Sequence, residues 1–355
     1  MKWMKRSAIG LAAAGYLLRR QLSKIDLEGK LVLITGGSRG LGLELARRFA
    51  RAGSRLALLA RDTDELENAR AALESADVRA ALESADVLTI ACDVRNPLEI
   101  RRAVERIEAL SGPVDVLVNV AGVIDVAPFE HVDDADFQNS LDTHLWGPLR
   151  LTREVAARMK PGGRVVNISS IGGLVSVPHL LSYSVGKFAL TGLSEGLHAE
   201  LALRGIRVTT VCPGLMRTGS HVRARFKGRQ RDEFAWFAAS SGFPLASMNA
   251  RRAAAKIVAA CRAGTPFLIL TPQARALHLV RAIAPNATAA AMRLVARLLP
   301  EPAGTGGEAR REGWQSTSRF APSLLTRLAD GAIERNNELA GPAREAYFRK
   351  SSAET

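Results

Sequence analysis

The chain has 355 residues, a formal net charge of +14 at pH 7 and an apolar fraction of 47%. This apolar fraction supports a sizeable buried core and excludes disorder of the chain as a whole. The positive charge is spread along the sequence, without zinc-finger spacing or an aromatic–basic pattern of the RNA-binding kind. We therefore expect a basic solvated surface and no nucleic-acid partner.

Residues 1–28 form a basic and apolar leader. Its apolar run, residues 7–18, has basic residues on both sides. A bilayer span needs about 20 apolar residues, so this run is too short to cross one. We expect either a helix on a membrane surface or a packed or frayed helix without a membrane role. The three cysteines lie far apart, which favours a reducing compartment and thus the cytoplasm, with peripheral contact at the inner face of a membrane left open.

Seven short apolar runs follow the leader, separated by stretches of helical periodicity. Each run is continuously hydrophobic, which is typical of strands buried on both faces of a parallel sheet. Strands that alternate with helices predict βαβ units. We therefore expect residues 29–272 to form an α/β domain with a doubly wound parallel sheet of about seven strands. The runs are 30–37, 55–61, 87–94, 114–122, 163–170, 206–214 and 266–272.

Three further segments interrupt or extend this domain. Residues 70–87 contain the same nonamer twice in tandem. Two copies are too few for a solenoid, so we expect a surface insertion without a functional role. Residues 273–300 have the pattern of two amphipathic helices, which we expect to pack on the core, join subunits or touch a membrane, in that order. Residues 301–355 are polar and glycine-rich, and predict a partly disordered tail with one helix over 323–340.

The stretch TGGSRGLG, residues 35–42, follows the first strand and opens a helix. Glycines at such a turn let backbone N–H groups approach a pyrophosphate, and the helix N-terminus adds partial positive charge. The last glycine is not followed by Lys-Ser or Lys-Thr, so the turn is not a P-loop. A tight turn without a ligand is the alternative. The residues that we expect to contact the phosphates are Gly36, Ser38, Arg39, Gly40, Leu41 and Gly42.

This turn, with spacing TG-x3-G-x-G, and five later motifs resemble the short-chain dehydrogenase/reductase family in its classical branch. The resemblance covers roughly residues 30–272 and implies a single Rossmann-type domain with an NAD(P) site. It also implies an oxidoreductase that interconverts a carbonyl and an alcohol. The family's usual NNAG is NVAG here, with Val120 in place of the second asparagine. The later motifs, in the family's order, are Asp93–Val94, Asn119–Gly122, Ser170, Tyr183–Lys187 and Pro213–Thr218.

The end of the second strand indicates the cofactor. An acidic residue there binds the ribose of NAD, whereas an arginine accommodates the extra phosphate of NADP. Ala60 or Arg61 stands at this position, and neither is acidic. Arg61 and Arg39, which lies in the glycine turn, can bind the extra phosphate, so we expect NADP (NADPH) rather than NAD. If the strand ends one residue later, Asp62 occupies this position, and its carboxylate would favour NAD as the cofactor. The resemblance implies that Asp93 and Val94 border the adenine, that Asn119, Ala121 and Gly122 line the cleft, and that Pro213, Gly214 and Thr218 flank the nicotinamide.

Tyr183 and Lys187 are four residues apart and share one face of a helix. A neighbouring ammonium lowers the pKa of a phenol from about 10 toward the working pH. Tyr183 can then give a proton to a carbonyl oxygen or take one from an alcohol. The resemblance implies that Lys187 also bonds to the nicotinamide ribose and that Ser170 polarises the substrate carbonyl. No cysteine pair has metal-ligand spacing, and we expect no metal.

One position departs from the family's pattern. Many members have an asparagine in N-L-x-G on the helix after the fourth strand, which holds a water that links the lysine to solvent. Here the stretch is HLWG, with His144 at that position. His144 either replaces the asparagine in the proton relay or is a packed histidine.

Residues 218–248 contain FAWFAASSGFP and predict a lid over an apolar substrate, although these aromatic residues are equally compatible with a core role. Two other functions stay open: a nucleotide-binding sensor without chemistry, and a membrane-associated assembly protein. The resemblance also implies a homo-oligomer, whose usual interface the C-terminal extension could block or replace.

Overall fold

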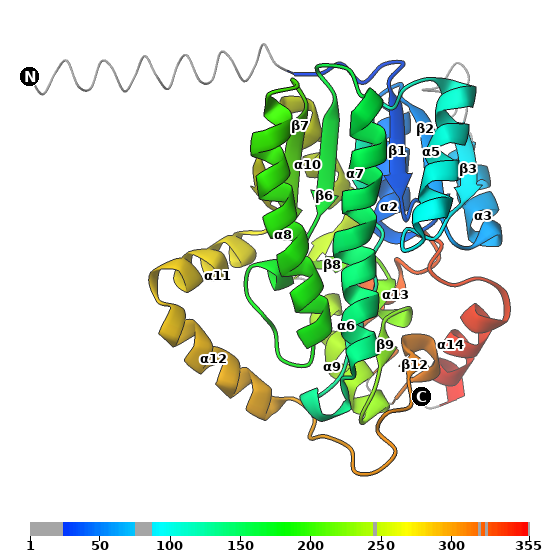
Figure 1. Cartoon of the computed structure of the whole chain (residues 1–355). Coiled ribbons are helices and arrows are strands. Elements are labelled where there is room, and N and C mark those ends of the chain that lie inside the picture. Colours follow the sequence, from blue (N-terminus) through cyan, green and yellow to red (C-terminus); the bar gives the residue numbers. More distant parts are fainter. Residues whose placement is uncertain (1–23, 75–86, 244–246, 319–320, 324–325, 354–355) are drawn as a thin grey trace, which may run out of the picture.

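A seven-stranded parallel sheet forms the centre of the molecule (Figure 1). The computed structural model describes residues 24–74, 87–243, 247–318, 321–323 and 326–353. The strand order is β11-β7-β6-β4-β1-β2-β3, which confirms the predicted doubly wound sheet. The strands are β1 (Leu31–Thr35), β2 (Arg55–Ala60), β3 (Val87–Ala91), β4 (Val116–Asn119), β6 (Arg164–Ile168), β7 (Arg207–Cys212) and β11 (Phe267–Ile269).

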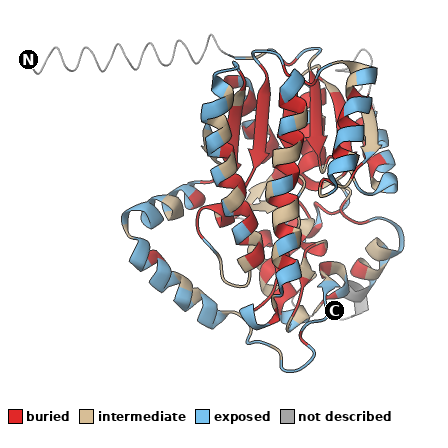
Figure 2. Ribbon diagram, in the orientation of Figure 1, coloured by how far each residue is buried: buried red, intermediate tan, exposed pale blue. Residues whose placement is uncertain are grey.

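Helices cover both faces of this sheet, which is why its strands are continuously apolar. Every residue of β1, β4 and β6 is buried, and Figure 2 shows the strands as the buried centre. One apolar core joins the sheet to α2 (Gly40–Ala50), α3 (Thr63–Leu73) and α10 (Ala250–Ala263). A second core joins its other face to α5 (Pro97–Ser111), α7 (Gly147–Arg158) and α8 (Leu181–Ala202).

A smaller lobe lies beyond the carboxyl ends of the strands (Figure 1). Its core contains Phe226, Phe234 and Phe237, so three aromatic residues of the expected lid, residues 218–248, pack inside the protein. Further elements outside the central sheet and its covering helices are β5 (Asp125–Val126), η1 (Phe129–His131), α6 (Asp134–Leu141), the π-helix η2 (Asp142–Trp146), η3 (Ile171–Gly173), β8 (Leu215–Arg217), η4 (Ser220–Val222), β9 (Arg225–Phe226), α9 (Gln230–Gly242), β10 (Ser247–Asn249), β12 (Arg311–Glu312), η5 (Gly313–Gln315), α13 (Arg327–Asp330) and α14 (Gly341–Ala353).

The later part of the C-terminal segment is packed against the lobe, in contrast to the expected loose tail. Ile333, Leu339 and Tyr347 are buried in the core of the lobe. The expected helix over 323–340 is only the short α13, and the longer α14 follows it. These apolar residues stand singly among polar ones, so composition did not reveal that they pack.

The stretch after the sheet forms two helices, as expected: α11 (Pro272–Ile283) and α12 (Pro285–Leu298). They project from the body and are mostly exposed (Figures 1 and 2). Within the described ranges, no helix is long and apolar enough to cross a bilayer. Residues 1–23 of the leader and 75–86 of the nonamer repeat lie outside the described residues, so their predicted roles stay predictions.

Candidate active site

The strand order places the site. The chain leaves β1 toward β2 and β3 on one side, then returns to β4 on the other side of β1. In such sheets, ligands bind beyond the carboxyl ends of the strands at this switch point. The glycine turn after β1 and the predicted catalytic residues after β6 both lie at these ends.

The glycine turn is packed tightly against the segment after β4. A Cβ on Gly36 would lie 2.9 Å from the Cα of Ala121, and a Cβ on Gly42 would lie 1.9 Å from the carbonyl oxygen of Gly36. Thr35 Oγ1 accepts the N–H groups of Val120 and Ala121, both at 3.1 Å. Only glycine fits these two positions, and Thr35 holds the turn in place.

The polar residues of the turn are already paired within the protein. Ser38 Oγ donates to Glu65 Oε2 at 3.1 Å, and the Arg39 guanidinium lies 3.1 Å from Glu65 Oε1. The backbone N–H of Gly40 donates to the carbonyl oxygen of Asn336 at 2.8 Å. Asn336 belongs to the C-terminal segment, which therefore reaches the glycine turn.

β2 ends at Ala60, and Arg61 is the next residue. Arg61 is exposed and has no hydrogen bond or ion pair within the described part of the chain. Although the residue is exposed, the protein around its guanidinium partly desolvates it and lowers its pKa; Asp93 opposes this shift, and the guanidinium groups of Arg95, Arg39 and Arg225 add to it. Asp62 caps α3 by accepting the N–H of Glu65 at 2.9 Å. Arg61 therefore occupies the position after β2 where the sequence predicts a cation, and other arginine side chains lie near it.

The predicted adenine and cleft residues lie near these strand ends with partners of their own. Arg95 binds Asp93, and these hydrogen bonds outweigh desolvation and lower the pKa of the Asp93 carboxyl. Val94 is buried and packs directly against Gly147, where a Cβ would meet it. Asn119 Nδ2 donates to Asn167 Oδ1 at 2.8 Å. The Asn119 side chain is therefore part of the sheet interior.

Ser170, Tyr183 and Lys187 come together between β6 and α8. Ser170 Oγ accepts the N–H of Gly172 at 3.0 Å. A Cβ on Gly172 would lie 3.2 Å from Tyr183 Cε1 and 3.5 Å from Ser170 Oγ, so the serine and the phenol ring flank this glycine. Lys187 Nζ lies 5.7 Å from the centroid of the Tyr183 ring and donates to the carbonyl oxygen of Ile168 at 2.9 Å. The three predicted side chains thus form one cluster.

The electrostatics of this cluster differ from the expected pattern. Burial raises the pKa of Tyr183, although its hydrogen bond with Ser170 acts in the opposite direction. Burial also lowers the pKa of Lys187 to about 7. The pocket disfavours both charged forms, so Lys187 does not lower the pKa of Tyr183 as the sequence argument assumed.

His144 lies in the π-helix η2, wholly buried, 5.6 Å from the Tyr183 ring between centroids. Its Nε2 accepts the N–H of Val123 at 3.3 Å. Ser140 Oγ donates to the carbonyl oxygen of Ser182 and lies 3.2 Å from His144 Nδ1, so the ring proton is assigned to Nδ1. Burial, followed by the charge of Lys187, lowers the pKa of His144 well below its usual value. The ring is a neutral imidazole with both nitrogens bonded.

The segment after β7 supplies the remaining predicted positions. The carbonyl oxygen of Pro213 accepts the N–H of Ile171 at 2.7 Å, which links Pro213 to the loop that follows Ser170. A Cβ on Gly214 would lie 2.7 Å from Thr271 Oγ1, so Gly214 faces the start of α11. Thr218 is buried, and its carbonyl oxygen accepts Nδ2 of Asn336 at 2.7 Å. The same C-terminal residue thus contacts both the glycine turn and Thr218.

Sequence reasoning missed several residues that shape this site. Thr35 follows the apolar run of β1 and could have been noticed as a polar residue at a buried strand end. Gly172 lies two residues after Ser170, and only the structure reveals its contact with Tyr183. Ser169, which the family spacing sets aside, donates to the carbonyl oxygen of Lys187 at 3.0 Å and so positions α8. No sequence signal placed Asn336 at the turn.

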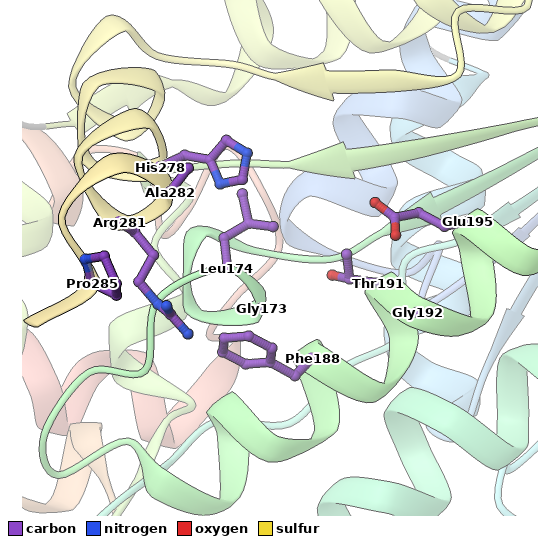
Figure 3. Close-up of a pocket in the computed structure, with 10 residues that line it drawn as sticks. All are labelled: Gly173, Leu174, Phe188, Thr191, Gly192, Glu195, His278, Arg281, Ala282 and Pro285. Atoms are coloured by element: carbon purple, nitrogen blue, oxygen red, sulfur yellow. The ribbon is translucent and has the colours of Figure 1, made fainter. Parts of the chain in front are cut away.

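A cavity of about 470 Å³ lies between α8 and the α11–α12 pair (Figure 3). Phe188 and Glu195 line it from α8, and His278 and Arg281 line it from α11. Tyr183 and Lys187 do not line it, so this cavity is separate from the catalytic cluster. Within the described ranges, no group of three or more His, Cys, Asp or Glu side chains is arranged to hold a metal ion.

Comparisons with known proteins agree with this geometry. A family model described as short chain dehydrogenase matches residues 30–227. The chain is 35% identical over 195 residues to Oxidoreductase UcpA of Escherichia coli, which covers 54% of this chain and 71% of that protein. It is 34% identical over 194 residues to D-threitol dehydrogenase of Mycolicibacterium smegmatis, covering 54% and 72%.

Solved structures give the same result. L-sorbose reductase from Gluconobacter frateurii, in complex with NADPH and L-sorbose, has a TM-score of 0.61 at 26% identity, over 69% of this chain and 97% of that one. A short-chain dehydrogenase from Streptomyces avermitilis has a TM-score of 0.63 at 31% identity, over 76% and 98%. The chain therefore belongs to the classical short-chain dehydrogenase/reductase family and is an NAD(P)-dependent oxidoreductase that interconverts carbonyl and alcohol groups.

Proposed function

We propose that the protein is an NADP-dependent reductase or dehydrogenase of an apolar ketone, aldehyde or alcohol, with Tyr183 as the general acid and base. The observation that carries this proposal is the cluster of Ser170, Tyr183 and Lys187, which lies at the same edge of the sheet as the glycine turn. When bound, the nicotinamide supplies or accepts a hydride at the carbonyl carbon. The proton at the oxygen comes from, or returns to, the Tyr183 hydroxyl.

The chain's own residues prepare this proton transfer. The Ser170 hydroxyl lies beside the phenol, where it can donate a hydrogen bond to the substrate oxygen and fix its position. Tyr183 stays protonated before reaction because burial raises its pKa, which suits a proton donor to a carbonyl oxygen. Lys187 has a pKa near 7, so its ammonium forms readily when negative charge develops on the phenol.

The preference for NADP rests on Arg61. This guanidinium is unpaired within the described part of the chain, and other guanidinium groups lie close to it, so it fits a phosphate on the adenosine ribose. Asp62 is engaged at the cap of α3, where it does not supply the carboxylate that favours NAD. The complex of L-sorbose reductase with NADPH is a further support. Arg39 must exchange its contact with Glu65 before it can bind the same phosphate.

The apolar substrate rests on a smaller set of residues than the sequence suggested, because Phe234 and Phe237 pack in the core of the lobe. Ile124, Leu180 and Trp236 are partly buried at the edge of that core, and Leu180 lies three residues before Tyr183. These three side chains favour an aliphatic or aromatic carbonyl. We expect His144 to hold the segment after β4 rather than to carry protons, since both of its ring nitrogens are bonded.

The test is oxidation of NADPH and NADH by the purified full-length protein over a panel of aliphatic, aromatic and steroid-like carbonyls. We expect turnover with NADPH and an apolar carbonyl. A parallel fluorescence titration of both nucleotides measures binding on the same sample. Tight NADPH binding without turnover on any carbonyl would favour the sensor, and binding of neither nucleotide would refute the proposed function.

A further inference from the structure

A strap formed by residues 333–339 crosses the phosphate-binding turn. The carbonyl oxygen of Asn336 accepts the N–H of Gly40, the first residue of α2, at 2.8 Å. Asn337 Nδ2 donates to the carbonyl oxygens of Ser38 and Glu65, both at 3.0 Å. The strap therefore engages the Gly40 N–H, which we expect to face a nucleotide, and is held beside it through two carbonyl oxygens.

The other side of the strap lies against the segment after β8. Asn336 Nδ2 donates to the carbonyl oxygen of Thr218 at 2.7 Å. A Cβ on Gly219, where φ is +91°, would lie 2.9 Å from the Cα of Ile333, so the two backbones are in direct contact. The strap thus passes between the two segments, one at Gly40 and one at Thr218, that are predicted to hold opposite ends of the dinucleotide.

The strap also brings a carboxyl group to the N-terminus of α2. Glu338 is 2% exposed, and its Oε1 would lie 2.7 Å from a Cβ on Gly40. Its Oε2 lies 3.8 Å from Arg39 Nε and has no hydrogen-bond partner within the described residues. A helix N-terminus beside an arginine favours an anion such as a phosphate, and the Glu338 carboxyl fills this position while the strap is docked.

Both ends of the strap are fixed in the protein core. Before it, Asp330 accepts from Tyr347 Oη at 2.8 Å and lies 3.0 Å from His221 Nε2. The last strap residue, Leu339, is buried in the same apolar core of the lobe as Tyr347. These anchors keep the strap close to the turn, so its local concentration there is high whether or not it is docked.

Two roles are conceivable for such a strap: it completes the nucleotide site, or it occupies that site. One N–H cannot serve both Asn336 and a phosphate in a normal hydrogen bond, and a carboxylate beside a phosphate repels it. Glu338 also competes for Arg39. These contacts favour occupation.

We propose that the strap is an intramolecular competitor of the cofactor, which occupies the phosphate site through Asn336, Asn337 and Glu338 and leaves when the dinucleotide binds. This proposal rests on the proposed nucleotide-binding function and concerns the regulation of the same site. The strap lowers the apparent affinity for the cofactor by the fraction of molecules in which it is docked.

Burial raises the pKa of Glu338 to about 7, while Arg39 and Arg223 oppose this shift and Glu65 adds to it. Arg223 comes from the segment after η4, Glu65 from α3 and Arg39 from the turn before α2, where the N-terminus of α2 also faces the carboxyl. Docking is therefore easier with a protonated Glu338.

Asn337→Gly tests this role in the full-length protein. Asn337 has a φ of +55°, which glycine adopts freely, so this variant removes two side-chain hydrogen bonds without adding strain. Asn336→Ala removes the bond to Thr218 and is the second variant. Glu334→Ala is the control, because among the described residues this exposed strap side chain pairs with Arg344 and makes no contact with the glycine turn.

Fluorescence titration with NADPH is expected to show tighter binding in both strap variants, by about 3- to 30-fold, and unchanged binding in the control. Hydrogen exchange of residues 333–339 is expected to increase when NADPH saturates the wild type. Weaker or unchanged binding in both variants, or slower exchange of the strap, would overturn the proposal. If neither the wild type nor a variant with a fast-exchanging strap binds any nucleotide, the proposed function itself fails.

Discussion

Replacing Lys187 by Met should stabilise the unliganded protein while it removes most of the activity. Lys187 is 4% exposed, and burial lowers its pKa from 10.5 to about 7. An amine whose pKa falls on folding costs stability as the pH drops from about 10.5 to about 7, and the cost is then constant below pH 7. Met keeps the apolar stem without the amine.

The size of the effect follows from the shift. A shift from 10.5 to about 7 corresponds to about 5 kcal/mol, at 1.36 kcal/mol for each pH unit. Loss of the hydrogen bond from Nζ to the carbonyl oxygen of Ile168 offsets about 1–3 kcal/mol of this gain, because that oxygen loses its partner. We therefore expect a net stabilisation of about 2–4 kcal/mol below pH 7, which disappears by about pH 10.

Urea unfolding of wild type and Lys187→Met at pH 6 and pH 10 measures this difference. Lys256→Met is the matched control, since Lys256 is exposed and its Nζ also donates to a carbonyl oxygen, that of Leu270. Carbonyl reduction by Lys187→Met should fall by about 10²–10⁴-fold. Equal destabilisation at both pH values would refute the assignment of a desolvated amine at this position.

Three further changes test other parts of the account. Arg61→Ala should weaken NADPH binding by about 10- to 100-fold and leave NADH binding unchanged, and equal loss for both nucleotides in a fluorescence titration would contradict the phosphate contact. Gly186→Ala should lower the melting temperature and the activity together, because its Cβ would lie 2.4 Å from Ser140 Oγ and 2.8 Å from His144 Nδ1. A variant with the same melting temperature as the wild type would disprove this packing. The pKa of Glu338 is raised to about 7, so a docked strap loses stability as the pH rises from about 4.5 to about 7. Strap exchange, corrected for intrinsic rates, should therefore rise over this range in the wild type and stay flat in Glu338→Gln.

The central sheet was predictable because its strands are buried on both faces. The run Leu31–Thr35 is apolar at every position but the last, and the helices that cover the sheet are recognised by their separate period of about 3.6 residues. The glycine turn and the Ser170–Tyr183–Lys187 cluster were equally accessible, since their spacing is local and their positions follow the strand ends.

The sequence could not reveal features that depend on tertiary packing. The pKa directions of Tyr183 and Lys187 follow from burial in a dry pocket, and helical spacing alone suggested the opposite shift for Tyr183. The packed state of Phe234 depends on its contact with Phe226, 5.5 Å away between ring centroids.

The strap was the largest omission. Its hold on the glycine turn comes mainly from backbone carbonyls and two asparagine side chains, which leave no hydrophobic period in the sequence. Its anchor, Tyr347, is a single aromatic residue in a polar stretch. Only the folded chain places residues 336–338 beside residues 38–40.

The most direct test of the central claim is the rate of NADPH-dependent carbonyl reduction by Tyr183→Phe, with NADPH affinity measured on the same sample. The account predicts a rate about 10²–10⁴-fold below the wild type, at unchanged affinity, because only the proton donor is removed. A variant that reduces the same carbonyl as fast as the wild type would show that Tyr183 is not the acid.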